Sequence, residues 1–280
     1  MEMAAILEYE FMRRAFVVGI LLAVITPCVG IIVVFKRLSM IGDALSHTSL
    51  AGVSAGLVMS INPILGSLLA CIIAALSIEA IRKKIPKYAE MSIAIIMSAG
   101  IGLAGVLSGF VKSSANFNSF LFGSIVAISD FEMILVIIIS CAVILSFFLL
   151  YKELFYIAFD ERSARLAGIP VKTINFIFTI LTAVTVSVAA RTVGALIVSS
   201  LMVIPVACAM QFGKSYKQTV IYSICFAVFF MMAGLYTAYY QRLKPGGTIV
   251  LIGVVCLVLI LSAKSLTAGL RHCKKIRHFN

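Results

Sequence analysis

Long apolar segments dominate this sequence and limit what it can fold into. Hydrophobic residues make up 62% of the 280 residues and charged residues 12%, whereas a soluble domain carries about 25% charged residues. A run of about 18 or more apolar residues is long enough to cross a bilayer as a helix. Nine apolar segments can be read, at residues 12–35, 40–59, 62–82, 90–110, 131–151, 173–190, 193–211, 219–240 and 246–264.

This pattern predicts an all-α fold, a polytopic transmembrane helical bundle of about eight or nine helices. Residues 1–280 are expected to form a single domain. The second, sixth and seventh segments are the least typical, because they are short or rich in small and hydroxyl residues.

The distribution of basic residues predicts an orientation. Lys and Arg collect on the cytoplasmic connections of polytopic proteins. With the N-terminus outside and the C-terminus in the cytoplasm, most of the 23 Lys and Arg residues fall inside. The minority that fall outside are Arg13, Arg14, Lys112, Arg191, Arg242 and Lys244. We therefore assign the net charge of +12 to orientation in a lipid membrane and expect no nucleic-acid partner.

Two connections and the C-terminus have features of their own. The outer connection, 111–130, contains FNSFLFGSIVAIS and is apolar enough to lie in the interface or dip into the membrane. The inner connection, 152–172, contains the helical stretch ERSARLA followed by Gly168 and Pro170, which are helix-terminating residues. This favours a short helix on the cytoplasmic surface over a plain solvated linker. Residues 265–280 are expected to form a basic cytoplasmic tail.

Asp43 and His47, within RLSMIGDALSHTSLAGVSAG (37–56), are the ionisable residues placed deepest in the apolar segments. Inserting an aspartate costs on the order of 3 kcal/mol, so such residues face a bundle interior or a water-filled path. A spacing of four places both on one helical face. A carboxylate and an imidazole suit Zn²⁺ or Mn²⁺. From the chemistry alone, a hydrogen bond from His47 to Asp43 at a packed interface fits equally well.

Small and hydroxyl residues surround this pair and recur in the second half of the chain. The later segment is RTVGALIVSSLMVIPVACA (191–209), with Pro205 near its middle. Interrupted segments in both halves are typical of transport sites. Ser46, Ser199 and Ser200 are therefore candidates for residues that line a path.

Motifs for ATP binding and for catalysis are missing from the sequence. It contains no GxxxxGK[ST] phosphate loop, so ATP hydrolysis would need a separate subunit. It also offers no nucleophile–base–acid set, and we expect no enzyme activity and no permanently bound cofactor. A secondary transporter or cation channel that uses Asp43, without an ATPase partner, remains an alternative class.

Four stretches resemble the membrane permeases of bacterial metal-ion ABC importers, the ABC-3 family for zinc, manganese and iron. They are RLSMIGDALSHTSLAGVSAG, SFLFGSIVAIS, FDERSARLAGIPV, and VGALIVSSLMVIPVACA followed by KPGGTIVLIGVVCLV. They occur in the family's order over almost the whole chain. One departure is Ser124, where some zinc members carry an acidic residue after LFG, and this argues against a metal contact there.

The resemblance implies an architecture and a set of roles. The expected complex holds two permease chains, two cytosolic ATP-binding subunits and an extracytoplasmic metal-binding protein, in the bacterial plasma membrane. The expected fold is related to the cobalamin and siderophore importers. The resemblance places Asp43 and His47 in the metal path, and it places the coupling to the ATPase at Asp160, Glu161, Ala164 and Gly168. LSHTSLAGVSAG is closer to zinc-type members, while the ligand chemistry also admits Mn²⁺ or Fe²⁺.

Overall fold

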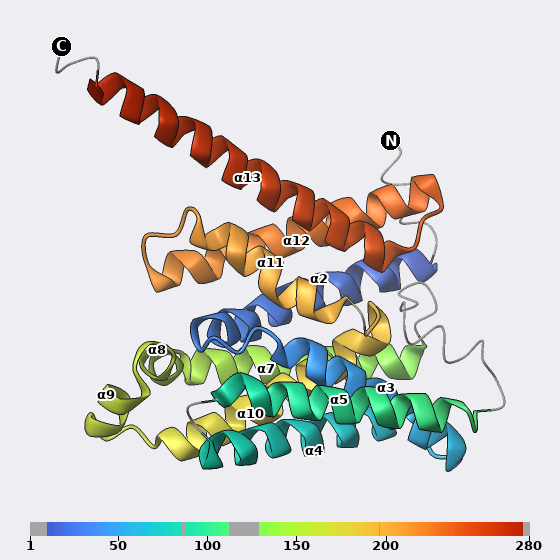
Figure 1. The fold of residues 1–280 in the computed structure, drawn as a ribbon. Coiled ribbons are helices and arrows are strands. Elements are labelled where there is room, and N and C mark those ends of the chain that lie inside the picture. Colours follow the sequence, from blue (N-terminus) through green and yellow to red (C-terminus); the bar gives the residue numbers. More distant parts are fainter. Residues whose placement is uncertain (1–9, 86–87, 112–128, 196, 277–280) are drawn as a thin grey trace.

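The computed structural model describes residues 10–85, 88–111, 129–195 and 197–276. All regular structure in these residues is helical (Figure 1). The helices are α2 (Glu10–Phe35), α3 (Ile41–Val58), α4 (Pro63–Lys84), α5 (Ala89–Ser108), α7 (Asp130–Leu149), α8 (Tyr151–Phe159), α9 (Glu161–Leu166), α10 (Val171–Thr192), α11 (Val198–Met210), α12 (Tyr216–Gln241) and α13 (Pro245–Ile276).

Each of the nine apolar segments expected from the sequence is a helix. Seven helices among the described residues are long and apolar enough to cross a membrane: α2, α4, α5, α7, α10, α12 and α13. The other two, α3 and α11, are the short segments rich in small residues. The prediction of an all-α polytopic bundle is therefore confirmed. The apolar stretch SFLFGSIVAIS, with Ser124, lies mostly outside the described residues.

Helix α3 lies inside the bundle. Most of its side chains are buried, and it packs against α4, α5, α10 and α11. Its closest approach is to α4: a Cβ built on Gly52 would lie 2.4 Å from the carbonyl oxygen of Gly66. Two glycines thus allow the backbones of α3 and α4 to touch, as small residues do between membrane helices.

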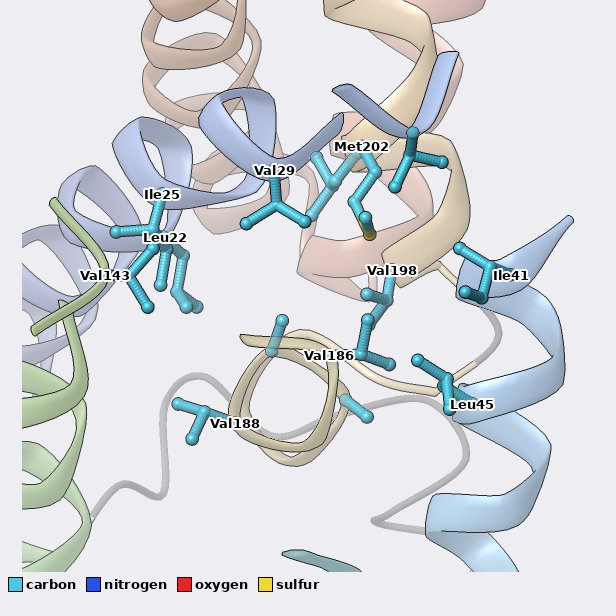
Figure 2. Packing of buried hydrophobic residues seen from close by; sticks show 14 of the residues in the cluster. Leu22, Ile25, Val29, Ile41, Leu45, Val143, Val186, Val188, Val198 and Met202 are labelled. Carbon is cyan, nitrogen blue, oxygen red and sulfur yellow. The ribbon is translucent and has the colours of Figure 1, made fainter. Parts of the chain in front are cut away.

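Aliphatic side chains fill the centre of the bundle. Figure 2 shows Val186 on α10 near Val198 on α11 and Leu45 on α3. Leu22 and Ile25 on α2 meet Val143 on α7 in the same view. These residues are almost fully buried, and this interior holds α3 in place.

The turn between α2 and α3 is compact. Arg37 adopts a left-handed conformation (φ 58°) at the end of α2. The amide of Leu38 donates to the carbonyl of Val33 at 2.9 Å and that of Arg37 to Val34 at 3.0 Å, the pair of bonds of a Schellman motif. The amide of Ile41 donates to Leu38 at 2.9 Å. The start of α3 is thus tied to the end of α2 by backbone bonds through Leu38.

The connection at 152–172 folds into two helices where one was expected. Helix α8 ends at Phe159, and Asp160 in an extended conformation starts α9. The predicted stop at Gly168 is present: its φ is +81°, and the amides of Gly168 and Ile169 donate to Arg165 and Ala164. Both helices project at one end of the bundle (Figure 1).

Helix α13 extends well beyond the bundle (Figure 1). It runs to Ile276 and so includes most of the basic segment 265–280. Its last turns leave the bundle at the same end as α8 and α9, which we call the α9 end.

Candidate functional site

Asp43 and His47 share one face in the first two turns of α3. Both are half-exposed, whereas Gly42, Ala44 and Leu45 beside them are buried. Within the described part of the chain, neither side chain makes a hydrogen bond or ion pair, so the His47–Asp43 bond considered above is not formed. The described part of the chain thus leaves a carboxylate and an imidazole half-exposed on one face of α3.

The pair supplies two side chains of the kinds that bind divalent metals, a carboxylate and an imidazole. No group of three or more His, Cys, Asp or Glu residues suited to a metal occurs among the described residues. A tight zinc site takes about four ligands. Two ligands suit transient contact with a passing ion better than a resident one.

The candidate serines lie close to this pair. Ser46 is buried, and its hydroxyl donates to the carbonyl of Gly42 at 2.7 Å, within its own helix. Ser199 on α11 packs against Gly42, whose added Cβ would lie 3.1 Å from the Ser199 Cα. Ser200 follows it and is half-exposed, like Ser199. The structure therefore brings α11 beside the turn of α3 that carries Asp43.

A chain of buried hydroxyls crosses three helices and was missed by the sequence analysis. Ser49 on α3 lies 2.7 Å from Ser67 on α4, and Ser67 lies 2.8 Å from Ser187 on α10. The sequence carries no signal for this chain of hydroxyls, because its members are 18 and 120 residues apart and serines are common on packed membrane helices. The three hydroxyls tie α3 to α4 and α4 to α10.

Asp160 and Glu161 organise the start of α9. Asp160 caps the helix: it accepts from the amide of Arg162 at 2.9 Å and from the hydroxyl of Ser163. The hydrogen bond from Ser163 is the main reason that the pKa of Asp160 lies below its usual range. Glu161 pairs with Arg165 at 3.6 Å. The two acids are therefore engaged within the chain.

Ala164 and Gly168 face opposite surroundings. Ala164 is buried against its own chain, so its small size serves the packing of α9 itself. Gly168 is open, with no atom within 4 Å of an added Cβ. Leu166, between them, is 84% exposed. Leu166 is thus the exposed apolar side chain of α9. The sequence analysis did not single it out.

Charged side chains from several helices meet beside α9. On α4, Glu79 pairs with Arg82 at 2.7 Å and Lys83 at 3.5 Å. A cavity of about 470 Å³ lies between these residues and α9 and is lined by Glu79, Arg82, Lys83, Ala89, Glu161, Arg165, Lys172 and Asn175. Neither Asp43 nor His47 lines it.

Ion pairs also join helices at the opposite end, which we call the Arg191 end. The Nε of Arg191 on α10 donates to Glu132 of α7 at 2.7 Å. Arg14 on α2 pairs with Asp130 of α7 at 2.7 Å. Polar contacts thus close both ends of the bundle around α3.

The described chain is thus a polytopic helical bundle in which a mostly buried helix, α3, carries a half-exposed Asp–His pair, an arrangement compatible with a membrane transport protein. The family model described as the ABC 3 transport family matches residues 8–264. The chain therefore belongs to the ABC 3 transport family, as its four motifs indicated.

Curated relatives match over most of their length. The chain is 34% identical to a "Probable metal transport system membrane protein" of Treponema pallidum, over 91% of this chain and 96% of that protein. It is 30% identical to the "Manganese transport system membrane protein MntC" of Listeria monocytogenes, over 89% of each. It is 27% identical to the "High-affinity zinc uptake system membrane protein ZnuB" of Haemophilus influenzae, over 90% of this chain and 97% of that one.

Solved structures share the fold. PsaBC from Streptococcus pneumoniae, in complex with Fab, aligns with a TM-score of 0.82 and 25% identity over 92% of this chain and 93% of that one. An inward-facing metal-chelate type ABC transporter aligns with a TM-score of 0.69 and 14% identity over 90% of this chain and 86% of that one, a likeness of fold alone. The expected relation to larger chelate importers is thus confirmed at the level of the fold.

Proposed function

We propose that this chain is the membrane permease subunit of an ATP-driven importer of a divalent transition metal. The observation that carries the proposal is the pair Asp43 and His47, half-exposed and without partners in the described chain, on a helix that is mostly buried. An acid in the membrane costs about 3 kcal/mol and is retained where it serves an ion path. The family match, together with the metal transport named for its relatives, supports metal as the cargo.

A second copy of the chain would complete the ligand set. Packing of two chains about a two-fold axis places the same surface of each against the other. If that surface is the Asp43 face of α3, two carboxylates and two imidazoles line one path. Four such ligands match the number that zinc prefers, and their division between chains suits release.

The ATPase subunits are proposed to bind at the α9 end. Leu166 is open there, as are Tyr156 and Phe159. Exposed apolar side chains with charged neighbours are typical of protein contacts. In this proposal Asp160 and Glu161 stabilise α9, and Leu166 packs against the ATPase subunit.

The orientation proposed places the α9 end in the cytoplasm and the Arg191 end outside. Basic residues from distant parts of the sequence gather at the α9 end, including Lys36, Arg82, Lys152, Lys172 and Lys264. An excess of Lys and Arg at one end sets the orientation of a membrane protein, with that end in the cytoplasm. An extracytoplasmic metal-binding protein would then deliver its ion at the Arg191 end.

The cargo proposed is Zn²⁺, on the likeness of LSHTSLAGVSAG to zinc-type members, with Mn²⁺ or Fe²⁺ as the alternative in the same architecture. Uptake of radioactive zinc, manganese and iron by cells with and without this chain tests the proposal. Zinc uptake that depends on the chain supports it. If only manganese uptake depends on the chain, the cargo is Mn²⁺ and not Zn²⁺. If the uptake of none of the three metals depends on the chain, the proposed function is wrong.

A further inference from the structure

Three polar side chains link α9 to the start of α3. The Nζ of Lys36, in the turn after α2, donates to Oδ1 of Asn175 at 2.6 Å. The Nδ2 of Asn175 on α10 donates to Oε1 of Glu161 on α9 at 3.3 Å. Asn175 is only 3% exposed. A buried amide therefore joins two segments that are far apart in the sequence.

The chemistry of the link depends on the amide. Its oxygen accepts and its nitrogen donates, so one side chain satisfies an ammonium on one side and a carboxylate on the other. A carboxylate at position 175 would repel Glu161, and an aliphatic side chain would serve neither charge. The residue type at 175 is thus matched to both partners.

Besides the hydrogen bond to Asn175, few contacts among the described residues stabilise the ammonium of Lys36. Its ammonium lies 5.5 Å from the centre of the Phe178 ring. Burial is the main cause that lowers the pKa of Lys36 to about 8, Arg82 lowers it further, and Glu161 and Glu79 oppose the shift. The hydrogen bond to Asn175 is therefore a principal fixed contact of this ammonium, which a shift of α10 or α9 would disturb.

The position of Lys36 bears directly on α3. Lys36 follows the last residue of α2, and the turn from Phe35 to Ile41 is closed by the backbone bonds of Arg37, Leu38 and Ile41. Leu38 is buried and anchors the turn. A turn bonded in this way moves as one piece, and α3 begins at its end.

We propose that Asn175 and Lys36 are positioning residues that transmit movement of α9 to the first turn of α3, and so to Asp43. The inference rests on the proposed function, in which an ATPase subunit contacts α9 and the metal contacts Asp43. Neither residue touches the metal or the nucleotide. Their role is to make the position of one helix depend on the other.

The test compares Asn175→Leu, which has a similar volume and no hydrogen bonds, with Thr179→Val. Thr179 lies one turn further along α10 and lines the same small cavity as Lys36, and within the described residues its hydroxyl bonds only to the carbonyl of Asn175. The measurement is backbone hydrogen exchange of the 36–47 peptide in the chain purified with its ATPase subunit, with and without ATP. We expect ATP to change this exchange in the parent and in Thr179→Val, and the change to shrink about fivefold or more in Asn175→Leu.

A rescue separates transmission from simple packing. The double variant Lys36→Glu with Glu161→Lys exchanges the two charges. Rotation of the Asn175 amide by about 180° then lets its nitrogen donate to the new carboxylate and its oxygen accept from the new ammonium. Each single change should lower metal uptake per ATP hydrolysed by about tenfold, and the double change should recover most of it. A double variant as poor as the worse single variant contradicts the proposal.

The two experiments fail in different ways. If the parent chain takes up no metal, the proposed function is wrong. The hydrogen-exchange measurement does not depend on metal uptake, so it still tests whether Asn175 transmits movement from α9 to α3. If Asn175→Leu keeps the full response of the 36–47 peptide to ATP, the link is wrong, whatever the cargo.

Discussion

Glu132 and Arg191 form an ion pair of 2.7 Å although they are 59 residues apart in the sequence. The Glu132 side chain is 9% exposed, and it also accepts from the amide of Ser129 at 3.0 Å as part of a capping box. One carboxylate therefore both starts α7 and joins it to the last turn of α10.

Removing the charge of Glu132 should destabilise the bundle. Glu132→Gln keeps the capping box, since Gln also fits there, but it weakens a charge-assisted bond worth roughly 1.5–3 kcal/mol. The measurement is thermal unfolding in detergent. Asp130→Asn is the control: it removes the same charge two residues away, from a side chain 74% exposed, and should cost at most about 1 kcal/mol. Equal shifts in both variants contradict this account.

The Asp43 and His47 pair gives a direct test of the metal path. Asp43→Asn and His47→Ala should each lower metal uptake by about tenfold or more, the equivalent of ~1.4 kcal/mol at one ligand. Expression and association with the ATPase should stay unchanged, because neither side chain holds the fold together within the described chain.

Thr48→Val is the matched control for that experiment. Thr48 neighbours His47 on the same helix, and in the part of the chain that the structure describes its hydroxyl bonds only to the carbonyl of Ala44. Its uptake should remain normal. Normal uptake in both Asp43→Asn and His47→Ala would place the metal path elsewhere.

The buried serine chain should contribute to stability through Ser67. Ser67→Ala removes the middle hydroxyl and both of its bonds, to Ser49 and Ser187. Hydrogen bonds between membrane helices are worth about 0.6 kcal/mol on average and up to ~1.7, so we expect a loss of about 1–2 kcal/mol in unfolding free energy. Ser77→Ala, on the same helix but bonded to Ile73 alone, should change it little.

Docking of the ATPase should depend on Leu166. Leu166→Glu places a charge where the proposed contact is apolar, and we expect the ATPase to be lost from the purified complex while the chain remains folded. Arg162→Glu, exposed on the same short helix, changes charge without removing an apolar contact and should retain more of the subunit. Full retention of the ATPase by Leu166→Glu argues for a docking site elsewhere.

Orientation can be measured with single cysteines and a membrane-impermeant thiol reagent, after subtraction of the parent's labelling. Lys84→Cys and Lys152→Cys, at the α9 end, should react only from the cytoplasm. Gln241→Cys, at the end of α12, should react from outside. Reaction of Lys84→Cys or Lys152→Cys from outside would reverse the proposed topology.

Hydropathy predicted the helices well because each is either apolar throughout or bounded by charges. Even α3 and α11, which fall short of a membrane span, were predicted as apolar segments, although α11 begins at Val198, later than expected, and continues through Pro205. Helix α9 matches the predicted stretch ERSARLA, but α8 was missed, because the preceding KELFYIAF follows the apolar segment 131–151 with no residue that marks a new helix. What separates them is the cap that Asp160 makes, which depends on local backbone geometry.

The candidate site was predictable in part. Asp43 and His47 stand out in sequence because a charge within an apolar run is costly. Asn175 does not stand out, because a single neutral amide near a helix end is common. Its importance comes from Lys36, 139 residues away, and no local pattern shows that pairing.

The low apolarity of α3 also bears on how the chain is made. An aspartate costs up to about 2.5–3.5 kcal/mol during insertion, the value for a helix centre, and the serines and glycines around Asp43 add little that would offset its cost in the first turn of α3. What α3 needs is the surface of α4, which it meets backbone to backbone at Gly52 and Gly66. Helix α4 follows after a short turn and leaves the ribosome directly behind it. We therefore expect α3 to enter the bilayer together with α4, so that the order in which the helices are synthesised is itself part of assembly.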